Sequence, residues 1–411
     1  MTYSSALLLT LAFTLAVSAN PVVIRDSPIT LPITKRLNAN GTFNLLERDQ
    51  ARVKGLKQFA RQKISGTLVD AVVASVPVTN QAVDYVANVG VGTPPTTFSL
   101  LVDTGSSNTW VGAGKAFRST SSTSQTSDRV SVTYGSGSFS GNEFIDTVTL
   151  GSGLTITKQS IGVATRSTGF DGVDGILGIG PVDLTVGTLT NARATIPTVT
   201  DNLFSQGIIT SNLVAVSFAP TSSESITNGE LTFGGTDSSK FTGSIHFAPI
   251  TSTSPASEFW GIDQTIRYGA STSIQSLTAG IVDTGTTLVL IASDSFRRYT
   301  TATGGVNDRT TGLLRLTTAQ FANLQSLFFT VNGVTFELTA NAQIWPRALN
   351  TAIGGNANSV YLIVNDIGTP SGEGLDFING MTFLERFYSV FDTANQRVGL
   401  ATTSATTATP N

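Results

Sequence analysis

The sequence predicts an all-β body with a few short helices, and three observations support this fold class. From Ser75 onward, short alternating or β-branched runs such as 130–134 and 230–233 are separated by Gly, Ser, Asn and Thr. The 411 residues include 40 glycines, which suits many tight turns. Helical patterns are few and short, and the strongest cover residues 197–204, 293–301, 317–327 and 383–387.

Composition excludes several kinds of active site. The chain has no Cys and a single His, His246, so thiolate nucleophiles, disulfides and multi-histidine zinc sites are excluded. No serine-nucleophile motif accompanies His246, and we interpret it as a structural residue. The formal net charge of −3 gives no indication of nucleic-acid binding. Any enzymatic chemistry therefore falls to Asp, Glu, Ser, Thr, Tyr or Lys, and we expect no cofactor or metal.

The first 19 residues have the pattern of a secretory signal peptide. An apolar run covers residues 6–17, and the small residues at 17–19 suit a signal peptidase. The run is too short for a comfortable membrane-spanning helix, and a buried N-terminal helix is the alternative. We therefore expect a secreted, extracellular protein that does not associate with membranes.

A basic arm, residues 20–74, precedes an acidic body. Residues 20–70 hold nine Lys or Arg and four Asp or Glu, whereas acids outnumber bases in the residues that follow. Apolar residues recur at roughly helical spacing over 46–60, so part of the arm could be an amphipathic helix. The opposite charges favour a pro-segment that docks on the body and is removed later, with its end between residues 66 and 75. A solvated charged linker is the alternative.

An internal repeat marks the candidate site. Residues 101–107 (Leu-Val-Asp-Thr-Gly-Ser-Ser) match residues 281–287 (Ile-Val-Asp-Thr-Gly-Thr-Thr). Each copy is followed by a glycine signature, at 174–178 and at 376–380. Two ordinary β-turns are the alternative interpretation, but two signatures repeated in the same order are much less expected by chance.

The repeat predicts a pair of carboxylates. Each apolar strand would end at an Asp on a tight turn, and a two-fold arrangement of the halves would bring Asp103 and Asp283 together. Two carboxylates within hydrogen-bond reach share a proton over an acidic range, because ionising both is costly. One can then activate a water as a base while the other protonates a carbonyl oxygen as an acid.

With these motifs the chain resembles the pepsin-like aspartic proteases. Residues 103–110 and 283–287 match the two active-site signatures of that family, and Tyr-Gly-Ser-Gly-Ser at 134–138 matches its flap hairpin. The resemblance implies a bilobal fold of two pseudo-two-fold related β-lobes with a cleft between them, at 75–246 (with the flap) and 247–411. It also implies an acid endopeptidase with a preference for hydrophobic side chains, made as an inactive precursor.

The same resemblance assigns roles to residues around the two carboxylates. Asp103 and Asp283 would be the catalytic pair, and Gly105 and Gly285 would support them. Ser106 and Thr286 would bond the outer oxygens of the pair, while Thr104 and Thr284 would cross-brace the two loops.

The flap and one substrate pocket are also implied by the resemblance. Tyr134, Gly135 and Ser136 would cover the substrate, and Trp110 would hydrogen-bond Tyr134. The walls of the pocket for the residue before the scissile bond would be formed by Leu101, Phe170 and Ile176. Since some fungal relatives carry Asp where this chain has Ser136, we expect poor cleavage after Lys.

The family pattern implies partners and shows one local departure. A pro-segment lysine would pair with the carboxylates before activation, and Lys54, Lys57 and Lys63 remain alternatives. We also expect inhibition by pepstatin-type compounds, protein and peptide substrates, and a monomer that binds no nucleic acid. In the second glycine signature, Asn379 stands where the family usually has an apolar residue, and Met381 stands where an Asp is common. These two departures put the packing beneath Asp283 in doubt.

Two other functions stay open. A non-enzymatic relative with the same fold would usually lack one Asp of the pair or the flap Tyr. A glycosidase also uses paired carboxylates, but is not expected to place them in duplicated Asp-Thr-Gly turns. An acid protein-digestion assay with and without pepstatin separates the three functions.

Overall fold

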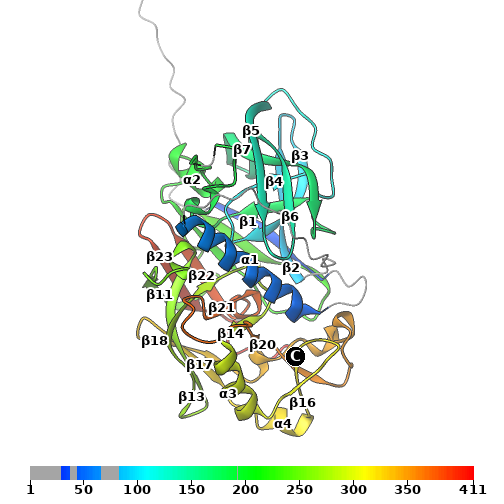
Figure 1. The fold of residues 1–411 in the computed structure, drawn as a ribbon, viewed down its shortest axis with the longest axis vertical. Coiled ribbons are helices and arrows are strands. Elements are labelled where there is room, and N and C mark those ends of the chain that lie inside the picture. The colour runs from blue at the N-terminus through cyan, green and yellow to red at the C-terminus, as the bar shows by residue number, and fades with distance from the viewer. Residues whose placement is uncertain (1–28, 38–43, 66–82, 192) are drawn as a thin grey trace, which may run out of the picture.

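A computed structural model describes residues 29–37, 44–65, 83–191 and 193–411 (Figure 1). Strands dominate these residues and helices are few, which confirms the all-β prediction. Within the same ranges, no helix has the length and apolar character needed to cross a membrane. The predicted signal peptide and the predicted end of the arm lie outside the described residues, and so does Asn40-Gly41-Thr42, a sequence that fits the N-glycosylation pattern Asn-X-Thr.

The largest sheet has 13 strands and joins residues from both ends of the chain. From edge to edge it runs β11 (Thr242–Pro249), β23 (Arg397–Thr402), β22 (Phe387–Asp392), β9 (Leu213–Ser217), β10 (Ser225–Phe233), β1 (Ile29–Leu37), β2 (Val83–Val91), β3 (Thr96–Asp103), β8 (Gly175–Gly178), β4 (Trp110–Val111), β7 (Leu154–Thr168), β6 (Ser138–Gly151) and β5 (Ser124–Thr133).

Two smaller sheets belong to the second half of the chain. The seven-stranded sheet runs β18 (Val334–Leu338), β17 (Leu327–Val331), β12 (Gly261–Tyr268), β13 (Thr272–Val282), β21 (Phe377–Asn379), β14 (Val289–Ile291) and β20 (Val364–Asp366). The three-stranded sheet runs β15 (Val306–Asn307), β16 (Leu314–Leu316) and β19 (Val360–Leu362).

The sequence repeat becomes a structural repeat. In the first half, β3 pairs in parallel with β8, so that Leu101 lies opposite Ile176. In the second half, β13 pairs in parallel with β21, so that Ile281 lies opposite Ile378. Each Asp-Thr-Gly turn therefore follows a buried strand that is paired in parallel with a second strand.

Helices connect the strands, and all of them except α1 are short. The α-helices are α1 (Leu45–Ser65), α2 (Val199–Ser205), α3 (Ser293–Thr303), α4 (Thr318–Ala322) and α5 (Met381–Leu384). The 3₁₀ helices are η1 (Val182–Thr185), η2 (Ala256–Glu258), η3 (Asn341–Gln343), η4 (Arg347–Leu349) and η5 (Thr351–Ile353). Both α2 and α4 begin with a capping box, in which Thr198 or Thr317 bonds the residue three positions on. Two predicted helices were too long, because Leu327 begins β17 and Phe387 begins β22.

The basic arm supplies a central strand as well as the predicted helix. β1 pairs antiparallel with both β10 and β2, and its Leu31 and Ile33 are buried at alternate positions. Lys35 continues this buried face, and its Nζ lies 2.5 Å from a carboxylate oxygen of Glu385. The sequence analysis missed this strand, which ties the arm into the middle of the largest sheet.

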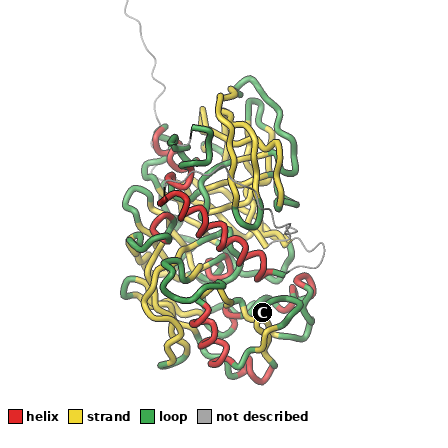
Figure 2. Tube along the Cα trace, viewed as in Figure 1, coloured by secondary structure: helices red, strands yellow, loops and turns green. Residues whose placement is uncertain are grey.

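Helix α1 crosses the middle of the molecule. Figure 1 shows it between strands β3 to β7 above and the sheet of β13, β17 and β18 below, and Figure 2 shows the same helix in red. Its Val53, Leu56 and Ala60 are buried in the main hydrophobic core, as expected for an amphipathic helix. The same buried face carries Asp49 and Arg52 toward the centre of the molecule, where the two Asp-Thr-Gly turns lie, whereas Lys54 and Gln58 on the opposite face are exposed.

Candidate active site

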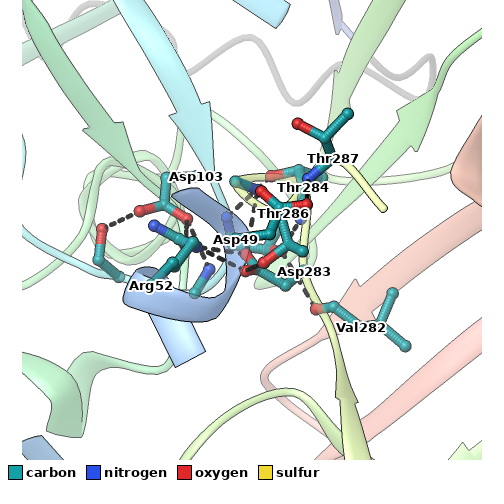
Figure 3. A network of polar contacts seen from close by, with 12 residues as sticks. Asp49, Arg52, Asp103, Val282, Asp283, Thr284, Thr286 and Thr287 are labelled. Atoms are coloured by element: carbon teal, nitrogen blue, oxygen red, sulfur yellow. Dashed lines mark hydrogen bonds and ion pairs between the residues drawn. The ribbon is translucent and has the colours of Figure 1, made fainter. Parts of the chain in front are cut away.

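The two carboxylates meet at one guanidinium group. Asp103 ends β3 and Asp283 directly follows β13, and both side chains are fully buried. Nη2 of Arg52, on α1, donates to Oδ1 of Asp103 at 2.6 Å and to Oδ1 of Asp283 at 3.0 Å (Figure 3). Since both oxygens accept from the same nitrogen, the structure brings the two residues together at the centre of the molecule.

Each carboxylate is held by its own turn. The backbone N–H of Gly105 donates to Oδ1 of Asp103 at 2.9 Å, and the Ser106 hydroxyl donates to Oδ2 at 2.5 Å. In the second turn, Gly285 donates to Asp283 Oδ1 at 3.0 Å and Thr286 donates to Oδ2 at 2.6 Å. The two turns thus present their carboxylates through matching sets of hydrogen bonds.

The two turns must have glycine after the Thr. A Cβ atom on Gly105 would lie 2.7 Å from Asp283 Oδ1, and one on Gly285 would lie 2.6 Å from Asp103 Oδ1. Real Cβ atoms do not approach an oxygen so closely. Each glycine therefore makes room for the carboxylate of the opposite turn.

Thr104 and Thr284 connect the two turns from below. The backbone N–H of each donates to the side-chain oxygen of the other, at 2.9 and 3.0 Å. Their hydroxyls donate in turn to the carbonyls of Val282 and Val102, at 3.2 and 2.9 Å. Four reciprocal hydrogen bonds in a buried place fix the separation of the two halves.

The electrostatics of the pair are asymmetric. Burial raises the pKa of Asp103 above its ordinary value; Arg52 opposes this rise and the neighbouring Asp283 adds to it. Burial also acts to raise the pKa of Asp283, but the charge and hydrogen bonds of Arg52, with those of Thr286 and Gly285, outweigh it and hold that pKa low. The pair therefore contains one carboxyl that takes a proton readily and one that gives it up readily.

The cation at the pair is Arg52, which corrects the prediction of a lysine. Lys54 is exposed. Lys57 donates to the Thr369 hydroxyl at 2.6 Å, and Lys63 lies 2.6 Å from a carboxylate oxygen of Glu258. All these residues share one helix, and Arg52 is on the turn of it that faces both carboxylates, with side-chain nitrogens bonded to each.

Two more arm residues that the sequence analysis did not single out flank Arg52. Asp49 is fully buried, and its Oδ2 accepts from the backbone N–H groups of Thr287 and Leu288 at 3.1 and 2.8 Å. Arg48 lies 2.9 Å from a carboxylate oxygen of Asp84 and donates to the Thr287 hydroxyl at 3.2 Å. Only their charge within an amphipathic pattern could have indicated such a role.

The flap closes onto helix α1. Between β5 and β6, the Tyr134 N–H donates to the Gly137 carbonyl at 2.8 Å, which closes a turn that contains Gly135 and Ser136. Gly135 has a positive φ of 77°, which favours glycine. A Cβ atom on Gly135 would lie 2.0 Å from the Ala51 carbonyl oxygen, and one on Gly55 would lie 2.5 Å from the Gly135 nitrogen. The helix therefore occupies the space directly beneath the flap.

The predicted pocket walls share one buried cluster with the flap residue Tyr134 and its expected partner Trp110. Leu101, Trp110, Tyr134, Phe170 and Ile176 are all members of it. The Phe170 ring meets both Trp110 and Tyr134 edge-on, with centroids 4.8 and 5.5 Å apart. The cluster also contains Phe139, stacked on Trp110 at 4.2 Å, which the sequence analysis missed.

The expected hydrogen bond between Trp110 and Tyr134 is not formed with normal geometry. Among the described residues, the buried Trp110 Nε1 and the buried Tyr134 hydroxyl both lack a directed hydrogen-bond partner. Trp110 nevertheless counteracts the strong rise that burial causes in the Tyr134 pKa, so the two groups are close. The two groups therefore lie close together without a hydrogen bond between them.

The part of the chain that the structure describes contains no group of three or more His, Cys, Asp or Glu residues that could hold a metal ion. His246, on β11, packs edge-on against Phe336, with ring centroids 6.4 Å apart.

Comparisons with known proteins agree with this geometry. Residues 84–403 match the family model described as eukaryotic aspartyl protease. The chain is 77% identical to polyporopepsin from Irpex lacteus over 338 residues, which are 82% of this chain and 99% of the relative. It is 35% identical to rhizopuspepsin-1 from Rhizopus niveus, over 84% of this chain and 88% of the relative. A crystal structure of aspartic proteinase from Irpex lacteus matches with a TM-score of 0.81 and 66% identity, over 94% of this chain and all of the other, which confirms the bilobal fold.

Proposed function

Since the chain belongs to the eukaryotic aspartyl protease family and is an aspartic-type endopeptidase, we propose that it is a secreted acid protease made as an inactive precursor. The catalytic pair is Asp103 and Asp283. The observation that carries this assignment is the convergence of the two buried carboxylates on one nitrogen of Arg52.

Removal of Arg52 leaves the two carboxylates facing each other. One proton shared between them satisfies the pair, because a second negative charge in this buried place is costly. The ionised member then takes a proton from a water, which attacks the peptide carbonyl, while the protonated member gives its proton to the carbonyl oxygen. When the resulting tetrahedral intermediate collapses, the C–N bond breaks and the leaving nitrogen takes the proton that the first carboxyl gained from the water. A hydroxyl of the intermediate returns its proton to the other carboxylate, which restores the shared proton.

The surrounding residues keep the pair in place during this cycle. Ser106 and Thr286 donate to the outer oxygens, so the inner oxygens, each of which accepts one backbone N–H from Gly105 or Gly285, are the ones turned toward the water and the substrate. The flap residues Tyr134, Gly135 and Ser136 cover an extended peptide, which adds itself as a strand between flap and cleft. The apolar cluster of Leu101, Trp110, Phe170 and Ile176 favours a hydrophobic side chain before the scissile bond.

The basic arm acts as the pro-segment. Three observations support this: Arg52 neutralises the pair, helix α1 fills the space under the flap, and β1 occupies the centre of the largest sheet. A peptide substrate cannot reach the pair while the helix is there. We therefore expect a precursor that is inert near neutral pH and is converted in acid.

A digestion assay tests the proposed function. The acid-treated chain should degrade a protein substrate at acid pH, pepstatin should stop it, and Asp103→Asn should abolish it while the fold is kept, as judged by circular dichroism. Digestion that continues in Asp103→Asn would contradict the assignment. A wild-type chain that folds but digests no protein would instead support a non-enzymatic relative.

A further inference from the structure

Asn379 stands where both ends of the Asp283 turn meet one strand. On β21 it pairs in parallel with Val282, directly before Asp283, and antiparallel with Val289, where the chain leaves the turn. The Asp283 backbone N–H donates to the Asn379 carbonyl at 3.2 Å. The backbone of Asn379 therefore fixes where the turn begins and ends.

The residues after Asn379 hold the rest of the turn. The N–H of Met381 donates to the Thr286 carbonyl at 2.7 Å, and that of Thr382 donates to the Thr287 carbonyl at 3.0 Å. A Cβ atom on Gly380 would lie 2.6 Å from the Thr286 oxygen, so this segment fits closely against the turn. Because the Thr286 hydroxyl bonds Asp283 directly, residues 379–382 form a brace beneath the carboxylate.

The side chain of Asn379 is locked to a residue on another strand. Its Nδ2 donates to Oε1 of Gln264 at 2.8 Å, and Nε2 of Gln264 donates to Oδ1 of Asn379 at 3.3 Å. Both side chains are fully buried, and β12, which carries Gln264, lies on the far side of β13. Each buried amide needs the other, because an unpaired polar group in such a place is costly.

The first repeat has an apolar residue at the matching place. There Leu177 lies opposite Val102, as Asn379 lies opposite Val282. Both strands are held by backbone ladders, but an apolar side chain adds no directed contact, whereas the two side-chain hydrogen bonds of Asn379 add a preferred orientation. The departure at Asn379 therefore brings a constraint to the Asp283 half that Leu177 does not bring to the other.

We infer that the Gln264–Asn379 amide pair is a positioning device, which holds the brace and thereby aims the Asp283 carboxylate. The inference rests on the proposed function, in which Asp283 reacts with water and substrate. The two amides act through the backbone of the brace and do not touch the reacting atoms. A catalytic group must be held within about 0.5 Å of its working position, and a misplacement of about 1 Å can cost roughly 100-fold in rate.

The test compares two double variants after acid treatment of the full chain. Gln264→Leu/Asn379→Leu removes both amides together, so neither is left unpaired, and its denaturation midpoint should stay near the wild-type value. Its kcat should fall by about tenfold, with KM changed by less than about twofold, because the substrate still binds but the Asp283 carboxylate is no longer held in its working orientation. The swapped pair Gln264→Asn/Asn379→Gln keeps one amide on each strand and should recover most of the lost kcat.

The outcomes separate positioning from packing. If the double-leucine variant Gln264→Leu/Asn379→Leu (the leucine pair) has the stability and the kcat of the wild type, the inference is overturned. It is also overturned if the swapped pair has a kcat as low as that of the leucine pair. If the leucine pair does not fold, Gln264→Met is measured at a temperature at which it is fully folded. An unchanged kcat then overturns the inference, and a reduced kcat at constant KM supports it.

A parallel measurement distinguishes this inference from the proposed function. If the wild-type chain digests no protein in acid, the proposed function itself fails. If the wild type is active, Asp283→Asn is inactive and the leucine pair is fully active, only the positioning role fails.

Discussion

At the scale of single residues, Arg52 joins the basic arm to the active site. Its guanidinium bonds both buried carboxylates, and their charges raise its pKa although burial opposes the charged form. An arginine in this place stays charged at any pH the protein meets. If the arm is released in acid, as proposed, the release must come from protonation of the carboxylates and not from loss of the Arg52 charge.

Arg52→Met should weaken the hold of the arm. Removing one partner of a buried ion pair costs about 3–5 kcal/mol, because the remaining charges are left uncompensated. We expect conversion of the precursor at pH 6, followed by gel electrophoresis, to be at least about tenfold faster. The matched control is Lys54→Met, two residues along the same helix and exposed, which should convert at the wild-type rate. Equal rates for Arg52→Met and wild type would contradict the role of Arg52.

The pKa of Asp283 gives a direction for the pH dependence of arm docking. A carboxyl whose pKa is held below its ordinary value of 3.8 stabilises the docked state above that value and loses this contribution as the pH falls further. The pKa of Asp49 is shifted in the opposite direction, since burial raises it from 3.8 to about 6. Its docked form binds a proton more tightly than its free form, so it favours docking in mild acid and opposes it at neutral pH.

Asp49→Asn should therefore strengthen docking at neutral pH. A pKa raised from 3.8 to about 6 means that wild-type Asp49 costs the docked state roughly 3 kcal/mol of stability as the pH rises through this range, and the variant avoids this cost. The urea midpoint of the precursor should be higher than that of the wild type at pH 7, and the difference should shrink at pH 5. A variant that is less stable than the wild type at pH 7 would show that the two backbone hydrogen bonds need the charged carboxylate.

At the scale of elements, helix α1 and the flap meet through two glycines. Gly55 and Gly135 allow the backbones to touch, and a side chain on either one would collide with the other element. Glycine inside a helix costs about 1 kcal/mol relative to Ala. The presence of Gly55 in the middle of α1 is explained by the closed flap and not by the needs of the helix.

Gly55→Ala separates these two effects by sign. If helix stability alone mattered, the change would strengthen the arm; if contact with the flap matters, it should weaken the arm and speed acid conversion by several-fold. Gln58→Ala, at an exposed position of the same helix, is the control and should have little effect. Slower conversion of Gly55→Ala than of the wild type would contradict the close contact.

The elements show how far the sequence could predict the site. The duplicated Asp-Thr-Gly turns placed Asp103 and Asp283 at strand ends, and the spacing of apolar residues predicted a helix within the arm. The spacing of apolar residues did not predict that Arg52 faces the carboxylates, because such spacing defines the buried face of a helix but not which residues of the body contact each helical turn. Likewise, Asn379 looked like a defect until its partner Gln264, 115 residues away in the chain, was known.

At the scale of the whole molecule, the arm is part of the central sheet. β1 lies between β10 and β2, and its Lys35 reaches Glu385 near the C-terminal end of the chain. Both side chains are almost completely buried, with 1% and 4% of their residue surfaces exposed, so salt should screen the pair little. The arm is thus held to the body by a sheet and a buried ion pair as well as by the contacts of α1.

Lys35→Met should destabilise the precursor. Glu385 would remain as a buried carboxylate without its cation, at a cost of about 3–5 kcal/mol, and the urea midpoint at pH 7 should fall clearly. The double variant Lys35→Met/Glu385→Leu removes both charges and should recover most of that loss, because apolar pairs often replace buried ion pairs without cost. A double variant as unstable as the single one would contradict this explanation.

The proposed mechanism requires that Asp103 and Asp283 share one proton in the working enzyme. The most direct test is the pH dependence of kcat/KM for cleavage of a peptide by the acid-treated chain, with Asp283→Asn as the control. We predict a bell-shaped profile confined to acid pH, whose two apparent pKa values belong to the pair, and no measurable cleavage by the control. Full activity at pH 8, or a profile that survives in Asp283→Asn, would contradict the claim.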